Sequence, residues 1–310
     1  MFPTRAVALA LGARTLVRTP TRPVAASLLV YGTRTVEPRR LPSVASHPSP
    51  SQNSSGTAPH KKSILGSLLH GNQGEERDLD EEHFATSQSA VPSRGKYVHE
   101  LLIHNVKPEA YDDYQALIAE YFPRLSNNPE YKMKLFGSWS TEIGSVDQCV
   151  HIWQYDNYPG YDESMSLRAK DPSHLAFMKS LRPMVTSREN QMMLEFDFWY
   201  TSEPQKYGGI YELRTYNLKP GRLLEWKNEW QKGIHARKKF VRPVGAWFSQ
   251  IGDLHVVHHM WHYPNLAARK EMREKAWEIE GWNKTSYNTT RMQQSMHCRI
   301  MRPFLFSPMG

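Results

Sequence analysis

Four histidines fall within the stretch GDLHVVHHMWHYP, residues 252–264, and their imidazoles could coordinate a metal ion. On a helix, at least three of His255, His258, His259 and His262 would share a face, and histidine is the commonest metal ligand. On a strand, successive side chains alternate, so His259 would lie on one face with Trp261 while His258 and His262 lay on the other. The intervening valines and aromatic residues, bounded by a turn and a proline, favour the strand. A zinc or iron site is therefore the weaker alternative.

An internal repeat bears directly on this choice. ELLIHNVKP at 100–108 matches ELRTYNLKP at 212–220 with an offset of 112, and GSWSTEIGSVDQCVHIWQY at 137–155 matches GAWFSQIGDLHVVHHMWHY at 245–263 with an offset of 108. Of the four clustered histidines, only His259 has an imidazole counterpart, His151. The repeated pattern therefore contains one histidine per half, and no metal ligands are predicted.

The elements that must position these residues follow the same order in each half. A strand is followed by a helix that opens at a proline and repeats its apolar residues every three or four positions, then by a hairpin, a broken helix and a final strand. The predicted strands lie at 97–106, 133–140, 148–155 and 191–199, and at 210–218, 241–249, 255–263 and 296–301. A four-stranded sheet covered by helices on one face leaves its other face bare, and a second copy can cover it. The predicted fold is α+β, with two tandem ferredoxin-like (βαββαβ) repeats packed sheet to sheet as a dimeric α+β barrel.

Charge is distributed unevenly along the chain. The net charge is +8, and residues 1–74 hold nine basic residues and one acid, so the remainder is balanced at 30 of each. This balance argues against nucleic acid as a partner, because the folded part carries no excess positive charge. Residues 1–40 are rich in Arg, Ala, Leu and Thr and hold a single acid, which predicts a mitochondrial presequence.

The remaining chain divides into three predicted parts. Residues 41–95 form a Ser- and Pro-rich, then acidic, linker with one short helix in KKSILGSLLHG, and the two repeats occupy 96–203 and 207–310. No apolar run reaches the roughly 18 residues that span a bilayer, so no transmembrane segment is predicted and peripheral membrane contact stays open.

The paired ELxxxNxKP and GxW…IG…HxWxY blocks, with the ending RIMRPFLFSP at 299–308, resemble the NIPSNAP family over residues 96–310. The resemblance implies tandem dimeric α+β barrels and a mitochondrial address, in the matrix with peripheral membrane association. For some animal members it also implies mitophagy signalling through autophagy adaptors. The family supplies no catalytic residue to transfer, so we expect a non-enzymatic protein-interaction or regulatory component with no cofactor.

One adaptor-type motif can be read in the chain, DDYQAL at Asp112–Leu117. A ligand peptide of this type must be extended to add a strand to its receptor. Tyr114 and Leu117, however, fall on the apolar stripe of the first predicted helix, which favours a role in the helix core.

The alternative function is a small-molecule-binding protein or cofactor-independent enzyme that uses the barrel interior. The candidate interior pocket comprises the charged, imidazole and indole side chains of Glu100, His151, Trp153, Arg188, Glu212, His259, Trp261 and Arg291. In an enzyme, an imidazole would act as general base and an arginine would hold an anion. The competing interpretation is a structural network in which buried polar groups pair with one another, and this is favoured because most buried polar groups do so.

Overall fold

The computed structural model describes residues 92–199 and 201–310. In chain order its elements are β1 (Ser93–Val106), η1 (Pro108–Ala110), α3 (Tyr111–Asn127), β2 (Met133–Ile143), β3 (Gln148–Tyr155), α4 (Tyr158–Lys170), α5 (Pro172–Met184), β4 (Val185–Phe196), β5 (Ile210–Leu218), α6 (Leu223–Lys238), β6 (Arg242–Ile251), β7 (Val256–Tyr263), α7 (Leu266–Trp277), α8 (Trp282–Arg291) and β8 (Gln293–Pro303). The second helical region of each repeat is broken, at Asp171 in the first and near Gly281 in the second.

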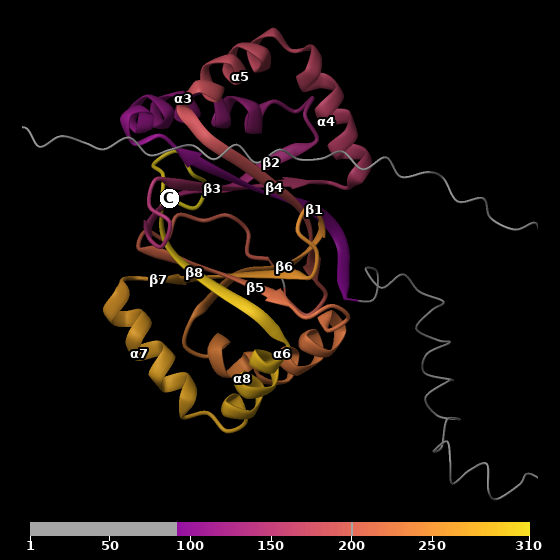
Figure 1. Cartoon of the computed structure of the whole chain (residues 1–310), viewed down its shortest axis with the longest axis vertical. Helices are drawn as coiled ribbons and strands as arrows, with labels where there is room; N and C mark the ends of the chain where they lie inside the picture. Colours follow the sequence, from indigo (N-terminus) through magenta and orange to yellow (C-terminus); the bar gives the residue numbers. More distant parts are fainter. Residues whose placement is uncertain (1–91, 200) are drawn as a thin grey trace, which may run out of the picture. The chain divides into compact units, whose positions relative to one another are not determined.

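The strands close into one antiparallel barrel in the order β1-β3-β2-β8-β5-β7-β6-β4. Each repeat contributes four neighbouring strands in the ferredoxin-like arrangement, and the repeats join where β2 pairs with β8 and β4 with β6. Helices α3–α5 cover the strands on one side and α6–α8 on the other (Figure 1). The predicted dimeric α+β barrel of two tandem repeats is confirmed.

The barrel interior is a packed core to which both sheets contribute. Its largest side chains are Trp139 and Trp247, both fully buried, with Phe136, Tyr211 and several methionines between them. Each of these tryptophans folds over a glycine two residues earlier, at a β-bulge that occurs at the same place in both repeats. The repeated GxW sequence is thus the means by which an indole fits inside the barrel.

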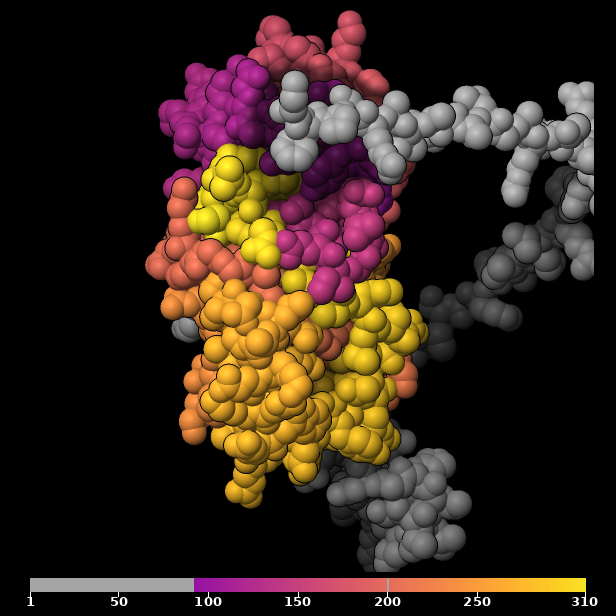
Figure 2. All heavy atoms as spheres, turned by 90° about the vertical axis from the view of Figure 1, so that its left-hand side faces the viewer, coloured from indigo at the N-terminus to yellow at the C-terminus, as the bar shows by residue number. Residues whose placement is uncertain are grey.

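Two further cores lie between the sheets and their helices, and the repeats exchange residues between them. The sequence FDFW, which starts at the last residue of β4, places Phe196 and Trp199 in the core beneath α6. The sequence FLF after β8 places Phe304 in the core beneath α3. Figure 2 shows the yellow C-terminal end against the magenta atoms of the first repeat. Each helix layer is therefore completed by the other repeat.

Hydrogen bonds from backbone and side-chain groups fix this exchange at the C-terminus. The Phe304 amide donates to the Ser138 carbonyl at 3.1 Å, and the Ser138 amide donates to Ser307 Oγ at 3.0 Å. The Tyr211 hydroxyl donates to the Met309 carbonyl at 2.8 Å, and Met309 is fully buried with the barrel interior. The sequence did not predict this packed tail.

Most predicted strands agree with the structure within a few residues, and 148–155 and 210–218 match fully. The exception is the fourth strand, which begins at Val185, six residues before the predicted start at 191. The predicted presequence at 1–40, the linker up to residue 91 and its short helix lie outside the described residues. None of the helices in the described part is long and apolar enough to cross a membrane.

The first prediction concerns the glycine beneath Trp247. A methyl group on Gly245 would lie 2.3 Å from the Trp247 ring, so Gly245→Ala overpacks the barrel interior. We expect the free energy of unfolding to fall by about 1–3 kcal/mol, measured by urea denaturation. The double variant Gly245→Ala/Trp247→Phe should lose less unfolding free energy than the sum of the losses in the two single variants, because the smaller ring relieves the contact. An unchanged urea midpoint for Gly245→Ala would contradict this packing.

Candidate functional site

The predicted site residues on the strands face the helices, not the barrel interior. Val150 and Ile152 point inward with the packed core, so their neighbours His151 and Trp153 point outward. The same alternation places Glu100 outside beside the inward Leu101, Glu212 outside beside Leu213, and His259 and Trp261 outside beside Met260. The predicted interior location is therefore wrong. The candidate residues belong to two clefts, one between each half of the barrel and its helices.

The two candidate arginines, Arg188 and Arg291, do not occupy equivalent positions in the two repeats. Arg188 lies on β4 opposite His104, and the corresponding residue opposite Tyr216 in the second repeat is Met296. Arg291 instead ends α8, where its guanidinium lies 5.4 Å from the Tyr287 ring centroid and is exposed. Arg188 lines the first cleft, while Arg291 does not line the second.

A chain of hydrogen bonds lies beneath α3 in the first repeat. The Tyr114 hydroxyl bridges two imidazoles, contacting His104 Nδ1 and His151 Nε2 at 2.8 Å each. His151 Nδ1 lies 2.6 Å from Ser138 Oγ. All four residues are buried, and each imidazole is supported by a hydroxyl. This supports the structural interpretation of His151, because its two nitrogens are already occupied.

Burial keeps these imidazoles neutral. It lowers the pKa of His104 to about 3, with a further contribution from Arg188, and holds the pKa of His151 well below its usual 6.5, with a further contribution from His104. A general base acts best when its pKa lies near the working pH, so neither histidine is suited to proton abstraction near neutrality.

The first cleft contains a cavity of about 220 Å³ lined by Glu100, Trp153 and Arg188 together with residues of α3, α4 and α5. Glu100 accepts hydrogen bonds from the Tyr155 hydroxyl at 2.9 Å and the Asn190 amide at 2.8 Å. Both direct partners of this carboxylate are neutral.

In the second repeat, the equivalent carboxylate is surrounded by arginines. Glu212 is fully buried and lies 2.9 Å from Arg214, 2.7 Å from Arg269, 3.8 Å from Arg273 and 3.9 Å from Arg237. Burial alone would raise the pKa of this carboxyl group, but Arg214, Arg269 and Arg273 hold it well below its usual value. Glu212 also accepts from the Tyr263 hydroxyl at 3.1 Å and the Cys298 thiol at 3.2 Å. The carboxylate is therefore fixed in its ionised form.

This charged cluster forms one wall of the second cavity, about 190 Å³ in volume. Arg214, Arg237 and Arg273 line it with His259, and the other lining residues include the indoles of Trp226, Trp230, Trp277 and Trp282. Trp261 lies behind His259 and donates its indole N–H to His259 Nδ1 at 2.7 Å. The second cavity is thus both aromatic and cationic.

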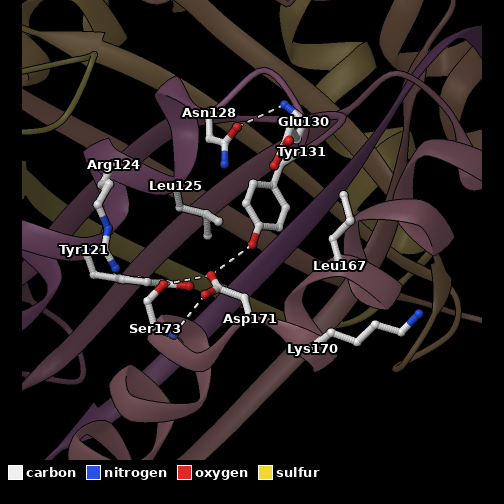
Figure 3. A pocket seen from close by; sticks show the side chains of 10 residues that line it. All are labelled: Tyr121, Arg124, Leu125, Asn128, Glu130, Tyr131, Leu167, Lys170, Asp171 and Ser173. Atoms are coloured by element: carbon white, nitrogen blue, oxygen red, sulfur yellow. Dashed lines mark hydrogen bonds between the residues drawn. The ribbon is translucent and has the colours of Figure 1, made fainter.

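A wider surface pocket of about 490 Å³ lies where α3 ends near the α4–α5 corner (Figure 3). Its central carboxylate, Asp171, caps α5 by accepting from the Ser173 amide at 2.8 Å and the Ser173 hydroxyl at 2.7 Å. Asp171 also accepts from the Tyr131 hydroxyl at 3.0 Å. These groups stabilise the start of a helix and bond to one another, so the pocket is a weaker candidate than the two clefts.

The structure also places the histidine-rich stretch and the adaptor-type motif. On β7, His258 and His259 point to opposite faces, as the strand interpretation predicted, with His258 bonded to Thr215 and Gln191. In the described part of the chain, no group of three or more His, Cys, Asp or Glu side chains is placed to hold a metal ion. Tyr114 of the DDYQAL motif is fully buried in α3, and the motif is helical rather than extended.

Sequence reasoning missed the four arginines around Glu212, which come from β5, α6 and α7. A signal for them exists in the repeat itself. With the offsets of 112 and 108, Arg214, Arg237, Arg269 and Arg273 correspond to Leu102, Leu125, Tyr161 and Met165 of the first repeat. These four positions, where the second repeat has arginine and the first has an uncharged residue, mark the second cleft as the one that differs in charge.

Comparisons of the sequence with known proteins agree on one family. The NIPSNAP family model matches residues 99–199 and 211–308. Protein NipSnap homolog 1 of Danio rerio is 41% identical over 68% of this chain and 76% of that protein, and protein NipSnap homolog 2 of Homo sapiens is 38% identical over 75% and 82%. An anthrone oxidase-like protein of known structure matches with a TM-score of 0.52 and 10% identity, covering 68% of this chain and 93% of that one. At that identity the match concerns the fold alone.

The two carboxylates provide a matched pair for mutation. Glu212→Gln leaves the arginines around one buried position without their counter-charge, and we expect the free energy of unfolding to fall by about 3–5 kcal/mol. Glu100→Gln should cost only about 1 kcal/mol, because its hydrogen-bond partners are neutral. Urea denaturation at neutral pH measures both. Equal losses in the two variants would contradict the charge asymmetry between the clefts.

Acid should destabilise the protein through its buried histidines. His99, His104, His151, His258 and His259 are at most 2% exposed, and burial lowers the pKa of each, to about 3 for His99, His104 and His258. The unfolded chain then binds protons more tightly, so stability is complete above pH 6.5 and is lost as the pH falls toward the folded-state pKa. Each histidine should contribute about 1.4 kcal/mol per pH unit in that window.

Urea midpoints between pH 7.5 and 5 measure this slope. His99→Phe should make it shallower, because it removes one titrating imidazole and keeps an aromatic ring packed against Phe136 and Trp247. The exposed His297→Gln serves as control and should leave the slope unchanged. A slope unaffected by His99→Phe would contradict the assignment.

Proposed function

Since the chain belongs to the NIPSNAP family, we propose that it is a non-enzymatic mitochondrial protein that acts as a protein-interaction or regulatory component. We include mitochondrial quality control, with autophagy adaptors as partners, in this proposal. The acid-poor, arginine-containing composition of residues 1–40 supports the mitochondrial address. The family resemblance supports the interaction role.

The observation that carries the non-enzymatic part is the packed barrel interior. Trp139, Trp247 and Tyr211 fill the barrel interior, which is where the alternative hypothesis places a substrate. In the first cleft, the imidazoles of His104 and His151 are bonded through Tyr114 and kept neutral by burial, which suits a structural network better than acid–base catalysis. A cofactor-independent enzyme that uses the barrel interior is therefore the weaker alternative.

An import assay directly tests the proposed mitochondrial localisation. Residues 1–45 fused to a fluorescent reporter should direct it into mitochondria, because a basic amphipathic segment is drawn to a negatively polarised membrane. A matched fusion with Arg5, Arg14, Arg18 and Arg22 changed to Gln should stay in the cytosol. Cytosolic fluorescence from the unmodified fusion would refute the mitochondrial assignment.

A second experiment tests the interaction role. It uses the full chain with an epitope inserted after His60, a position that avoids the buried C-terminal tail. Cross-linking in isolated mitochondria followed by mass spectrometry should recover partner proteins that a control lacking residues 1–40 does not reach. Recovery of no partner above this control would count against the interaction role.

A further inference from the structure

The second cleft carries more positive charge than its structure balances. The four arginines Arg214, Arg237, Arg269 and Arg273 share one carboxylate, that of Glu212, so three positive charges remain uncompensated in the cluster. Within the described residues, no second acidic side chain forms an ion pair with any of the four. Guanidinium groups are the preferred protein partners of carboxylates and other oxyanions. The cluster is therefore suited to accept an anion.

The fold itself does not require this charge. The first repeat builds the same cleft with Leu102, Leu125, Tyr161 and Met165 at the corresponding positions, and all four line its cavity. Uncharged side chains at these four positions thus satisfy the packing between sheet and helices. Burying several guanidinium groups costs free energy that apolar side chains avoid. The arginines call for an explanation other than packing.

Hydrogen-bond donors in the second cavity also lack acceptors. The indole N–H of Trp261 can only donate, so His259 Nδ1 must accept and the proton of the neutral imidazole lies on Nε2. His259 Nε2 has no hydrogen-bond partner, and the residue is 2% exposed. Arg237 Nε is likewise without a partner at 5% exposure. Two buried residues that line the cavity therefore offer donors to an oxyanion.

The walls of the cavity indicate what carries the anion. Trp226, Trp230 and Trp282 line it within the cleft, and Trp277, 54% exposed, lines its outer part. The volume of about 190 Å³ suits one aromatic ring with a small substituent, since a cavity of about 150 Å³ holds benzene. Flat rings pack favourably against indoles and beneath guanidinium groups.

We propose that the second-repeat cleft binds a small aromatic carboxylate, with its carboxylate held by Arg273, Arg237 and His259 and its ring held between the tryptophans. This site goes beyond the proposed interaction role and stands independently of it. The first-repeat cleft, with uncharged residues at the four arginine positions, is not expected to bind the same ligand.

Titration of the full-length protein with benzoate, followed by tryptophan fluorescence and calorimetry, tests the site. We expect binding with a Kd of about 1 mM or tighter. Benzamide, which has the same shape without the charge, should bind about tenfold more weakly, as should inorganic phosphate, which has charge without a ring. Equal binding of benzamide would overturn the anionic part of the proposal, and equal binding of phosphate the aromatic part.

Two variants locate the site. Arg273→Met installs the first-repeat residue and should weaken benzoate binding about tenfold, while Arg222→Met, an exposed arginine outside the cavity, should leave it unchanged. Trp277→Ala changes an exposed indole and keeps every arginine in place, so it should weaken binding severalfold even if Arg273→Met fails to fold. No benzoate binding at about 10 mM, or unchanged binding in the variants that fold, would overturn the proposal.

Discussion

The fold depends on mutual covering of two apolar sheet faces. Each repeat directs one face of its sheet to the helices and the other to the barrel interior, where Trp139 and Trp247 pack in corresponding places. Pairing of β2 with β8 and of β4 with β6 also removes the free sheet edges that a single repeat would expose. A single repeat could neither cover its inner sheet face nor pair its edge strands. Two repeats in one chain do both, whereas separate copies would have to associate as a dimer.

The exchange of chain ends adds a second dependence. Phe196 and Trp199 leave the first repeat to complete the core beneath α6, and Phe304 leaves the second to complete the core beneath α3. Trp199 lies 4.7 Å from Trp261 and 5.6 Å from Trp230 between ring centroids, next to the second cleft. The shape of each cleft is therefore set partly by residues of the opposite repeat, and both clefts require the closed barrel.

The repeat and the strand alternation were predictable from the sequence because each rests on local spacing. The alternation separated His258 from His259 correctly, but it could not state which face is the interior. In a barrel covered by helices, both faces of each sheet are buried. Val150 and His151 point to opposite faces and are both fully buried, so the hydropathy pattern does not show which face is the interior. The prediction placed the costly polar residues inside for this reason. The arginine cluster escaped notice because its members come from β5, α6 and α7, and only their comparison with the first repeat marks them out.

Once the barrel closes, its two outer clefts are free to differ. The inner core constrains residues such as Gly137 and Gly245, where any side chain would collide with an indole, and these are the same in both repeats. The clefts face helices rather than the partner sheet, so a change at Arg237 or at its counterpart Leu125 leaves the interior untouched. One cleft contains a neutral network of Tyr114 and two imidazoles, and the other contains concentrated positive charge around Glu212. Because the first repeat achieves the same fold without that charge, the second cleft is where this chain departs from what its architecture demands.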